Sequence, residues 1–147
     1  MGQDGTGSYR TANGGRDVPA GLPFTLRWEG VHVSTMETVQ HSARETVEAV
    51  EGVHLTQLAV GEDMSVQHFH FEPGAAVPEH SHHHEQVGYL TRGTFTFVVD
   101  GEEYVLGPGD SYSIPGDEPH AAENRTEEPV EGIDVFAPPR ANPDWMG

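Results

Sequence analysis

The chain has 147 residues, a mass of 16.0 kDa and a formal net charge of −17 at pH 7. This length suits one domain with a sizeable core, and the negative charge argues against nucleic acid and anionic membranes as partners. The absence of cysteine excludes disulfides and thiolate metal sites, and because we find neither an apolar run of about 20 residues nor an N-terminal signal segment, we expect a cytoplasmic protein.

The charge has two interpretations. All seven basic residues are arginine, against 24 acidic residues. The chain is either an ordinary acidic protein or one adapted to high salt, in which carboxylates retain water and their mutual repulsion is screened. We favour a halophilic protein.

The first 35 residues differ from the rest. Residues 1–35 are electrically neutral, whereas residues 36–147 hold 21 acidic residues and four arginines. Residues 2–15 are rich in Gly, Ser, Thr and Asn, which predicts disorder. Because Met36 begins the acidic part, residues 1–35 either precede the natural start or form an arm in which residues 24–33 add an edge strand or a dimer contact.

Short strands dominate the remaining chain. Residues 39–50 are the one weakly predicted helix. Strands bounded by turn residues are expected at 54–60, 65–71, 86–90, 94–99, 103–106, 112–114 and 130–136. Asp100-Gly101 predicts a hairpin turn. Many short strands without amphipathic helices indicate an antiparallel sandwich or barrel.

Histidines are the candidate metal ligands. Four of the ten histidines lie within residues 80–84. His80 and His82 are two positions apart, so on a strand they face the same way and can share one ion at about 2.0–2.1 Å. An exposed histidine tract without a specific site is the alternative. We interpret His68 and His70 as strand residues, one buried and one partly exposed.

Two spaced motifs give the histidines a context. The first consists of Gly74, His80, His82, Gln86 and Gly93, and the second of Gly109, Pro115, Asp117, His120 and Asn124. Both resemble the two motifs of the cupin superfamily, with Gln86 in place of the usual glutamate and Asp117 in place of a turn glycine, a substitution that Asp tolerates.

The resemblance implies an all-β, single-domain cupin, a double-stranded β-helix or jelly-roll barrel. It would cover residues 36–147, with residues 1–35 as a flexible N-terminal extension. It also implies one divalent metal ion (Ni, Zn, Mn, Fe or Cu) held by four residues: His80, His82, Gln86 and His120.

Gln86 is the informative departure. An amide oxygen brings no negative charge, so the ion would keep its full charge and act as a Lewis acid rather than an oxygen activator. His83 and His84 are rival ligands, and Gln86 has the alternative role of a hydrogen-bond donor beside the site.

The last predicted strand carries further candidates. Asp134 and Phe136 share one strand face, and Arg140 follows Pro138-Pro139. If that face lines the barrel, a carboxylate and an aromatic wall lie beside the metal, and a guanidinium is suited to grip a substrate carboxylate. The alternative is an Asp134–Arg140 ion pair with Phe136 in the core.

These features resemble the small cupins of pectin and alginate degradation, the KdgF type, which convert 4,5-unsaturated uronates into linear keto-deoxy-uronates. The resemblance implies that Asp134 transfers a proton at the enol carbon, Arg140 binds the uronate carboxylate and Phe136 packs against the ring. We therefore predict a metal-dependent isomerase-like enzyme of carbohydrate metabolism.

Other outcomes stay open. An oxidative cupin and a non-enzymatic cupin that binds a small ligand are the alternative functions. The expected partner is a small carboxylated sugar, with no nucleic acid or membrane, and we expect a homodimer because cupins commonly pair through edge strands.

Overall fold

The computed structural model describes residues 36–141 and 143. Over this part the chain forms ten strands and one short 3-10 helix, η1 (His41–Ala43). The strands are β1 (Thr46–Val50), β2 (Val53–Val60), β3 (Ser65–Phe71), β4 (Ala76–His80), β5 (Glu85–Arg92), β6 (Phe95–Val99), β7 (Glu102–Leu106), β8 (Ser111–Ile114), β9 (His120–Glu123) and β10 (Val130–Ala137). The predictions for residues 1–35 lie outside the described residues.

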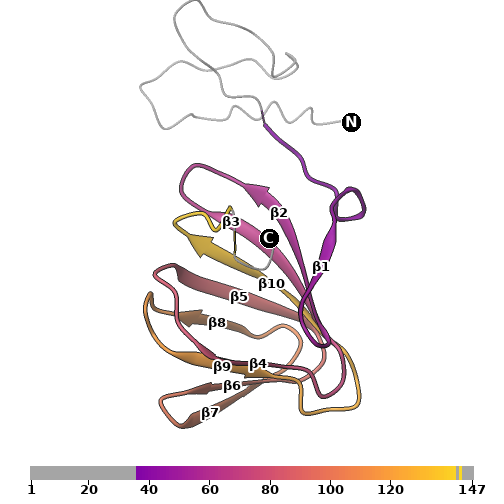
Figure 1. Cartoon of the computed structure of the whole chain (residues 1–147), viewed down its shortest axis with the longest axis vertical. Coiled ribbons are helices and arrows are strands. Elements are labelled where there is room, and N and C mark those ends of the chain that lie inside the picture. Colours follow the sequence, from indigo (N-terminus) through magenta and orange to yellow (C-terminus); the bar gives the residue numbers. More distant parts are fainter. Residues whose placement is uncertain (1–35, 142, 144–147) are drawn as a thin grey trace, which may run out of the picture. The chain divides into compact units, whose positions relative to one another are not determined.

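The strands form two antiparallel sheets. The larger has the order β1-β2-β3-β10-β5-β8, and the smaller has the order β4-β9-β6-β7. Figure 1 shows the six-stranded sheet above the four-stranded one. β10, the last strand in the sequence, pairs with β3 and β5 in the centre of the larger sheet. The all-β jelly-roll predicted from the sequence is therefore confirmed. Separately, no helix among the described residues is long and apolar enough to cross a membrane.

The strand predictions were accurate and the helix prediction was wrong. Each of the seven expected strands is present, with bounds shifted by at most two residues. Residues 39–50 form the single turn η1 followed by strand β1 instead of a helix. β1 contains β-branched residues at Thr46, Val47 and Val50, which favour the strand, and pairing with β2 supplies its backbone partners. β4 and β9 were not predicted.

Phenylalanines join the two sheets. Phe69 on β3 stacks on Phe95 of β6 with ring centroids 5.4 Å apart, and Phe71 meets the same ring at 4.8 Å. All three side chains are at most 4% exposed. Because burying each such ring contributes about 1.5–3 kcal/mol, this cluster helps to hold the two sheets together.

Alternation along the strands decides which side chains enter the barrel. In β10 the even-numbered residues from Val130 to Phe136 are buried and the odd-numbered ones are partly exposed. β3 alternates in the same way, with Gln67 buried and both His68 and His70 partly exposed. The expectation that one of these two histidines is buried was wrong, since both face outward and contact Glu131.

Candidate metal centre

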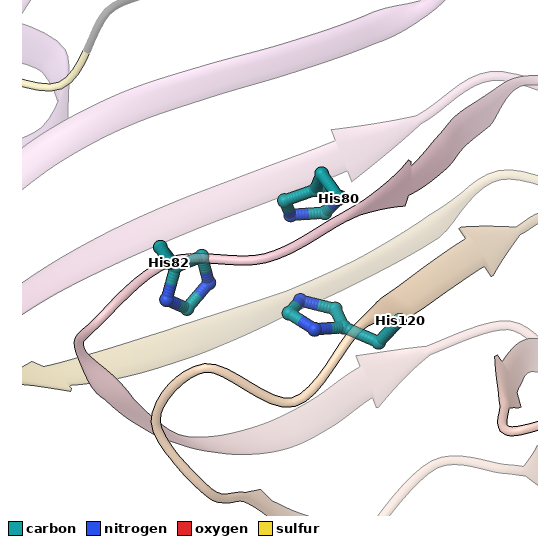
Figure 2. Close-up of side chains that lie close together, drawn as sticks. All are labelled: His80, His82 and His120. Carbon is teal, nitrogen blue, oxygen red and sulfur yellow. The ribbon is translucent and has the colours of Figure 1, made fainter.

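Three histidines meet inside the barrel. His80 ends β4, His82 lies in the loop that follows, and His120 begins β9. Figure 2 shows the three imidazole rings turned toward one another. Each offers one ring nitrogen, and these nitrogens lie within 4.8 Å of one another. The two-residue alternation of a strand therefore does not explain why His80 and His82 lie together, because β4 ends at His80. The loop after β4 places His82 in the cluster instead.

Backbone carbonyls fix the tautomer of each ring. In every case Nδ1 lies close to the carbonyl oxygen of the residue two positions away. The Nδ1–O distances are 3.0 Å from His80 to Pro78, 3.0 Å from His82 to His84 and 2.8 Å from His120 to Glu118. A carbonyl can only accept, so Nδ1 carries the proton and Nε2 keeps its lone pair. Metal-binding histidines commonly show this arrangement.

Gln86 completes the group from the start of β5. Its side chain is 7% exposed, and its Oε1 lies 3.2 Å from Nε2 of His82. With the His82 proton on Nδ1, both of these atoms present lone pairs, and a shared cation would relieve their repulsion. The Gln86 amide also hydrogen-bonds Asp134, which directs its NH2 group to the carboxylate and its oxygen to the imidazoles.

His83 and His84 lie outside the cluster. The His83 and His84 rings lie against each other, tilted, with centroids 3.9 Å apart, and the edge of the His84 ring meets that of His82 at 5.6 Å. Among the described residues, two groups could hold one ion: His80, His82 and His120, and the more exposed set of Glu48, His54 and Glu72. Neither group contains His83 or His84.

Burial favours the neutral form of two of the imidazoles, His82 and His120. It lowers the pKa of His82 to about 4, with additional lowering by Arg140 and the neighbouring histidines. Burial also lowers the pKa of His120. Neutral imidazoles and an amide oxygen are donors that Mn, Fe, Ni, Cu and Zn all accept. The residues present therefore fit a divalent metal ion.

The two sequence motifs dock on each other beside the cluster. Asp117 has φ +66°, and its amide donates a 2.7 Å hydrogen bond to the carbonyl of His82. Asp thus adopts the left-handed conformation expected of the turn glycine that it replaces. A Cβ on Gly116 would lie 2.5 Å from the His83 oxygen, so this turn needs glycine to approach the histidine loop.

Asp134 lies next to this group on the inner face of β10. It is 6% exposed, and its carboxylate accepts a hydrogen bond from the Tyr112 hydroxyl. Burial raises the pKa of Asp134 to about 6, against opposing effects of the hydrogen bonds from Tyr112 and Gln86 and of the Arg140 charge. A carboxyl group with such a pKa can hold or release a proton near neutral pH.

Tyr112 is a residue of the candidate site that the sequence analysis did not identify. It reaches Asp134 across Gly88, since Gly88 pairs with Asp134 on one side and with Tyr112 on the other. A Cβ on Gly88 would overlap the Tyr112 ring and lie 2.6 Å from Asp134 Oδ1. A glycine in the middle of β5, two residues after Gln86, was the available signal, because strand glycines often mark a close approach.

Arg140 and Phe136 lie against each other beside the histidines. The guanidinium carbon of Arg140 lies 5.2 Å from the centroid of the Phe136 ring, a cation–π distance. The Arg140 amide donates a 2.8 Å hydrogen bond to the Ser65 hydroxyl. Phe136 is 2% exposed and meets the His82 ring edge-on at 5.6 Å. It is therefore both a core residue and a neighbour of the histidines.

A cavity of about 380 Å³ connects these groups. Both sheets line this cavity. The larger sheet contributes Asp134, the chain just after β10 contributes Arg140, and the smaller sheet contributes His120 and Phe97. Cavities that bind small molecules typically measure about 300–1,000 Å³. The arrangement can therefore hold one small ligand against His80 and His120, a carboxyl group and a guanidinium.

Comparisons with known proteins agree with this arrangement. The sequence profile of the cupin domain family matches residues 67–136. The chain is 32% identical over 93 residues to the pectin degradation protein KdgF of Dickeya dadantii, covering 63% of this chain and 84% of that protein.

Solved structures give the same result. The structure of KdgF from a Halomonas species superposes with a TM-score of 0.67 at 28% identity, covering 74% of this chain and 98% of that one. An RmlC-like cupin from Shewanella frigidimarina superposes with a TM-score of 0.66 at 29% identity, covering 74% and 96% of the two chains.

Proposed function

The chain belongs to the cupin family, and on that premise we propose that it is a metal-dependent enzyme of pectin or alginate breakdown. Its reaction would open 4,5-unsaturated uronates and tautomerise them to keto-deoxy-uronates. The similarity to two KdgF proteins supports this proposal. The single observation that carries it is the buried Asp134 carboxyl beside three convergent imidazoles and Gln86.

The metal ion would be held by His80, His82, Gln86 and His120. When bound, it would supply Lewis-acid polarisation of a substrate oxygen, because four neutral donors leave its charge uncompensated. The reaction needs no oxidant or reductant, since substrate and product are isomers.

Arg140 would bind and orient the substrate carboxylate. Its guanidinium lines the cavity and lies against the Phe136 ring, which limits the directions it can point. A planar guanidinium pairs with a carboxylate through two parallel hydrogen bonds. Phe136 would give the sugar ring an apolar surface.

Asp134 would move the proton. Its carboxyl oxygen would deliver a proton to the enol carbon, and it would recover one as the enol oxygen loses its own, so the group ends as it began. The Tyr112 hydroxyl would hold the carboxyl group in place by its hydrogen bond. Burial in the barrel would keep water away from this step.

The test is turnover of a pectate-lyase digest, followed by loss of the double-bond absorbance. Arg140→Ala should lower kcat/KM by about 10–100-fold, the value of one charged hydrogen-bonding pair, with unchanged metal content. Arg92→Ala, which removes an exposed arginine paired with Glu131, is the matched control and should retain wild-type turnover. Wild-type activity of Arg140→Ala would disprove the proposal that Arg140 binds the substrate carboxylate.

The alternative functions give different results in the same assay. An oxidative cupin would consume oxygen and lose turnover under anaerobic conditions. A ligand-binding cupin would bind the digest without changing its absorbance. Metal analysis on protein purified without a nickel column would identify the ion.

We also propose a cytoplasmic homodimer adapted to high salt. The net charge of −17 supports salt adaptation. Val87 and Tyr89 on the outer face of β5 are 44% and 46% exposed, which offers an apolar surface for a second copy. Sedimentation in molar salt that detected monomers alone would disprove the dimer.

A further inference from the structure

Five neighbouring strands place a row of residues across the inner face of the larger sheet. Following the register from β2 to β8, Gln57 pairs with Gln67, Gln67 with Asp134, Asp134 with Gly88, and Gly88 with Tyr112. Four of these five residues carry polar side chains. The proposed mechanism uses Asp134 and Tyr112 and leaves the two glutamines without a role.

Gln67 is buried without a hydrogen bond for its oxygen. The side chain is 4% exposed, and within residues 36–141 and 143 no partner hydrogen-bonds its Oε1 atom. Leaving a buried polar group unpaired is costly, and native proteins keep few such groups without a reason. Binding a ligand is one such reason.

Gln67 also faces the cavity. It lies beside Asp134 on the side away from Tyr112, because β3 and β5 flank β10 on opposite edges. Beyond Gln67 the cavity is lined by Ala49 and Val50 of β1 and Leu55 of β2. Among the described residues that line the cavity on the side of β1, β2 and β3, the polar group offered to a ligand is the Gln67 carboxamide.

We propose that Gln67 is a binding subsite for a substrate hydroxyl that lies next to the carbon protonated by Asp134. The inference rests on the proposed function and extends it to substrate selection. The last side-chain torsion of glutamine is soft, so either end of the amide can turn to the cavity. A hydroxyl both donates and accepts, and therefore suits either orientation. The ligand class is a carboxylic acid with a hydroxyl beside the reacting double bond, rather than an acid that lacks this hydroxyl or an aromatic acid.

Gln57 supplies the competing explanation. Its Nε2 atom is also buried without a partner, and it pairs in register with Gln67. A small rotation of both amides could join this donor to the Gln67 oxygen, and Gln67 would then be structural. Gln57 does not line the cavity, so the two explanations predict different effects for the two glutamines.

The experiment compares Gln67→Met with the matched control Gln57→Met in the full-length, metal-loaded protein. Methionine keeps the length of the side chain and removes its hydrogen bonding. For the unsaturated uronate, Gln67→Met should raise KM about 10-fold, the value of one hydrogen bond, with kcat within about threefold of wild type. Gln57→Met should leave KM unchanged. An unchanged KM in Gln67→Met would overturn the proposal.

The unfolding temperature separates a ligand subsite from a structural pair without using activity. Measured without ligand, Gln67→Met should melt at or above the wild-type temperature, because an unpaired polar group has been removed. If the two glutamines form a pair, both variants should melt about 4 °C or more below wild type, and the subsite would be refuted.

A turnover assay of the wild type followed by a binding titration separates the subsite from the proposed reaction. Wild-type protein that fails to convert any uronate would disprove the proposed reaction. Calorimetric titration with galacturonate would then test the subsite. Weaker binding by Gln67→Met alone, with no loss of thermal stability, would support it, and equal binding by the two variants or no binding at all would refute it.

Discussion

The buried carboxyl of Asp134 should make the protein less stable as the pH rises. Folding raises its pKa from 3.8 to about 6 through burial. Below pH 3.8 the group is neutral in both states and costs nothing. As the pH rises through the interval from 3.8 to 6, the unfolded chain releases a proton that the folded protein retains, so stability falls until the folded group also ionises.

Asp134→Asn removes this cost. From the two pKa values, the linkage relation gives a penalty of about 1 kcal/mol at pH 4.5 and about 3 kcal/mol at pH 8. The stability of the variant relative to wild type should therefore increase by about 2 kcal/mol between these two pH values. Any pH-independent effect of the substitution cancels in this difference. The same variant should lose turnover, because an amide cannot deliver the proton.

Urea unfolding of metal-free protein at the two pH values is the assay. The metal must be removed because a bound cation would lower the pKa of Asp134. The change in relative stability of Asp134→Asn between the two pH values would then be smaller. Asp63→Asn is the control: it removes the same charge from an exposed turn, and should change stability by no more than about 0.5 kcal/mol at either pH. A relative stability of Asp134→Asn that stays constant between pH 4.5 and pH 8 would refute the reasoning.

Three further results are expected. Tyr112→Phe removes the hydroxyl that holds Asp134, so kcat should fall by about 10-fold or more while metal content stays unchanged; wild-type kcat would show that the hydrogen bond does not position the carboxyl group. Gly88→Ala places a Cβ against the Tyr112 ring and Asp134, and should lower both kcat and the free energy of unfolding, the latter by about 1–3 kcal/mol; a stable, active variant would contradict the close approach. Raising KCl from 0.1 M to 2 M should screen the charge of −17 and raise the unfolding temperature by about 5 °C or more; a flat or falling curve would argue for an ordinary acidic protein.

Local sequence pattern was enough to find most of the barrel. The strands show two-residue alternation, and turn residues separate them, so their positions follow from short stretches of chain. β10 illustrates this, since its alternation correctly assigned Asp134 and Phe136 to one face. β1 was missed although its β-branched residues favour a strand, because pairing with β2, which no local pattern reports, decided its conformation.

The candidate site divides in the same way. The resemblance to the two cupin motifs singled out His80, His82, Gln86 and His120, and the fold brings the three histidines within reach of one ion. The neighbours of Asp134 depend on which strands pair and in what register. Tyr112 reaches it across Gly88, and Gln67 lies on its other side.

Register between strands distant in sequence is set by packing of the whole barrel. The sequence by itself therefore determined most of the strands and the histidine motif, and the tertiary structure alone decided which polar side chains surround Asp134.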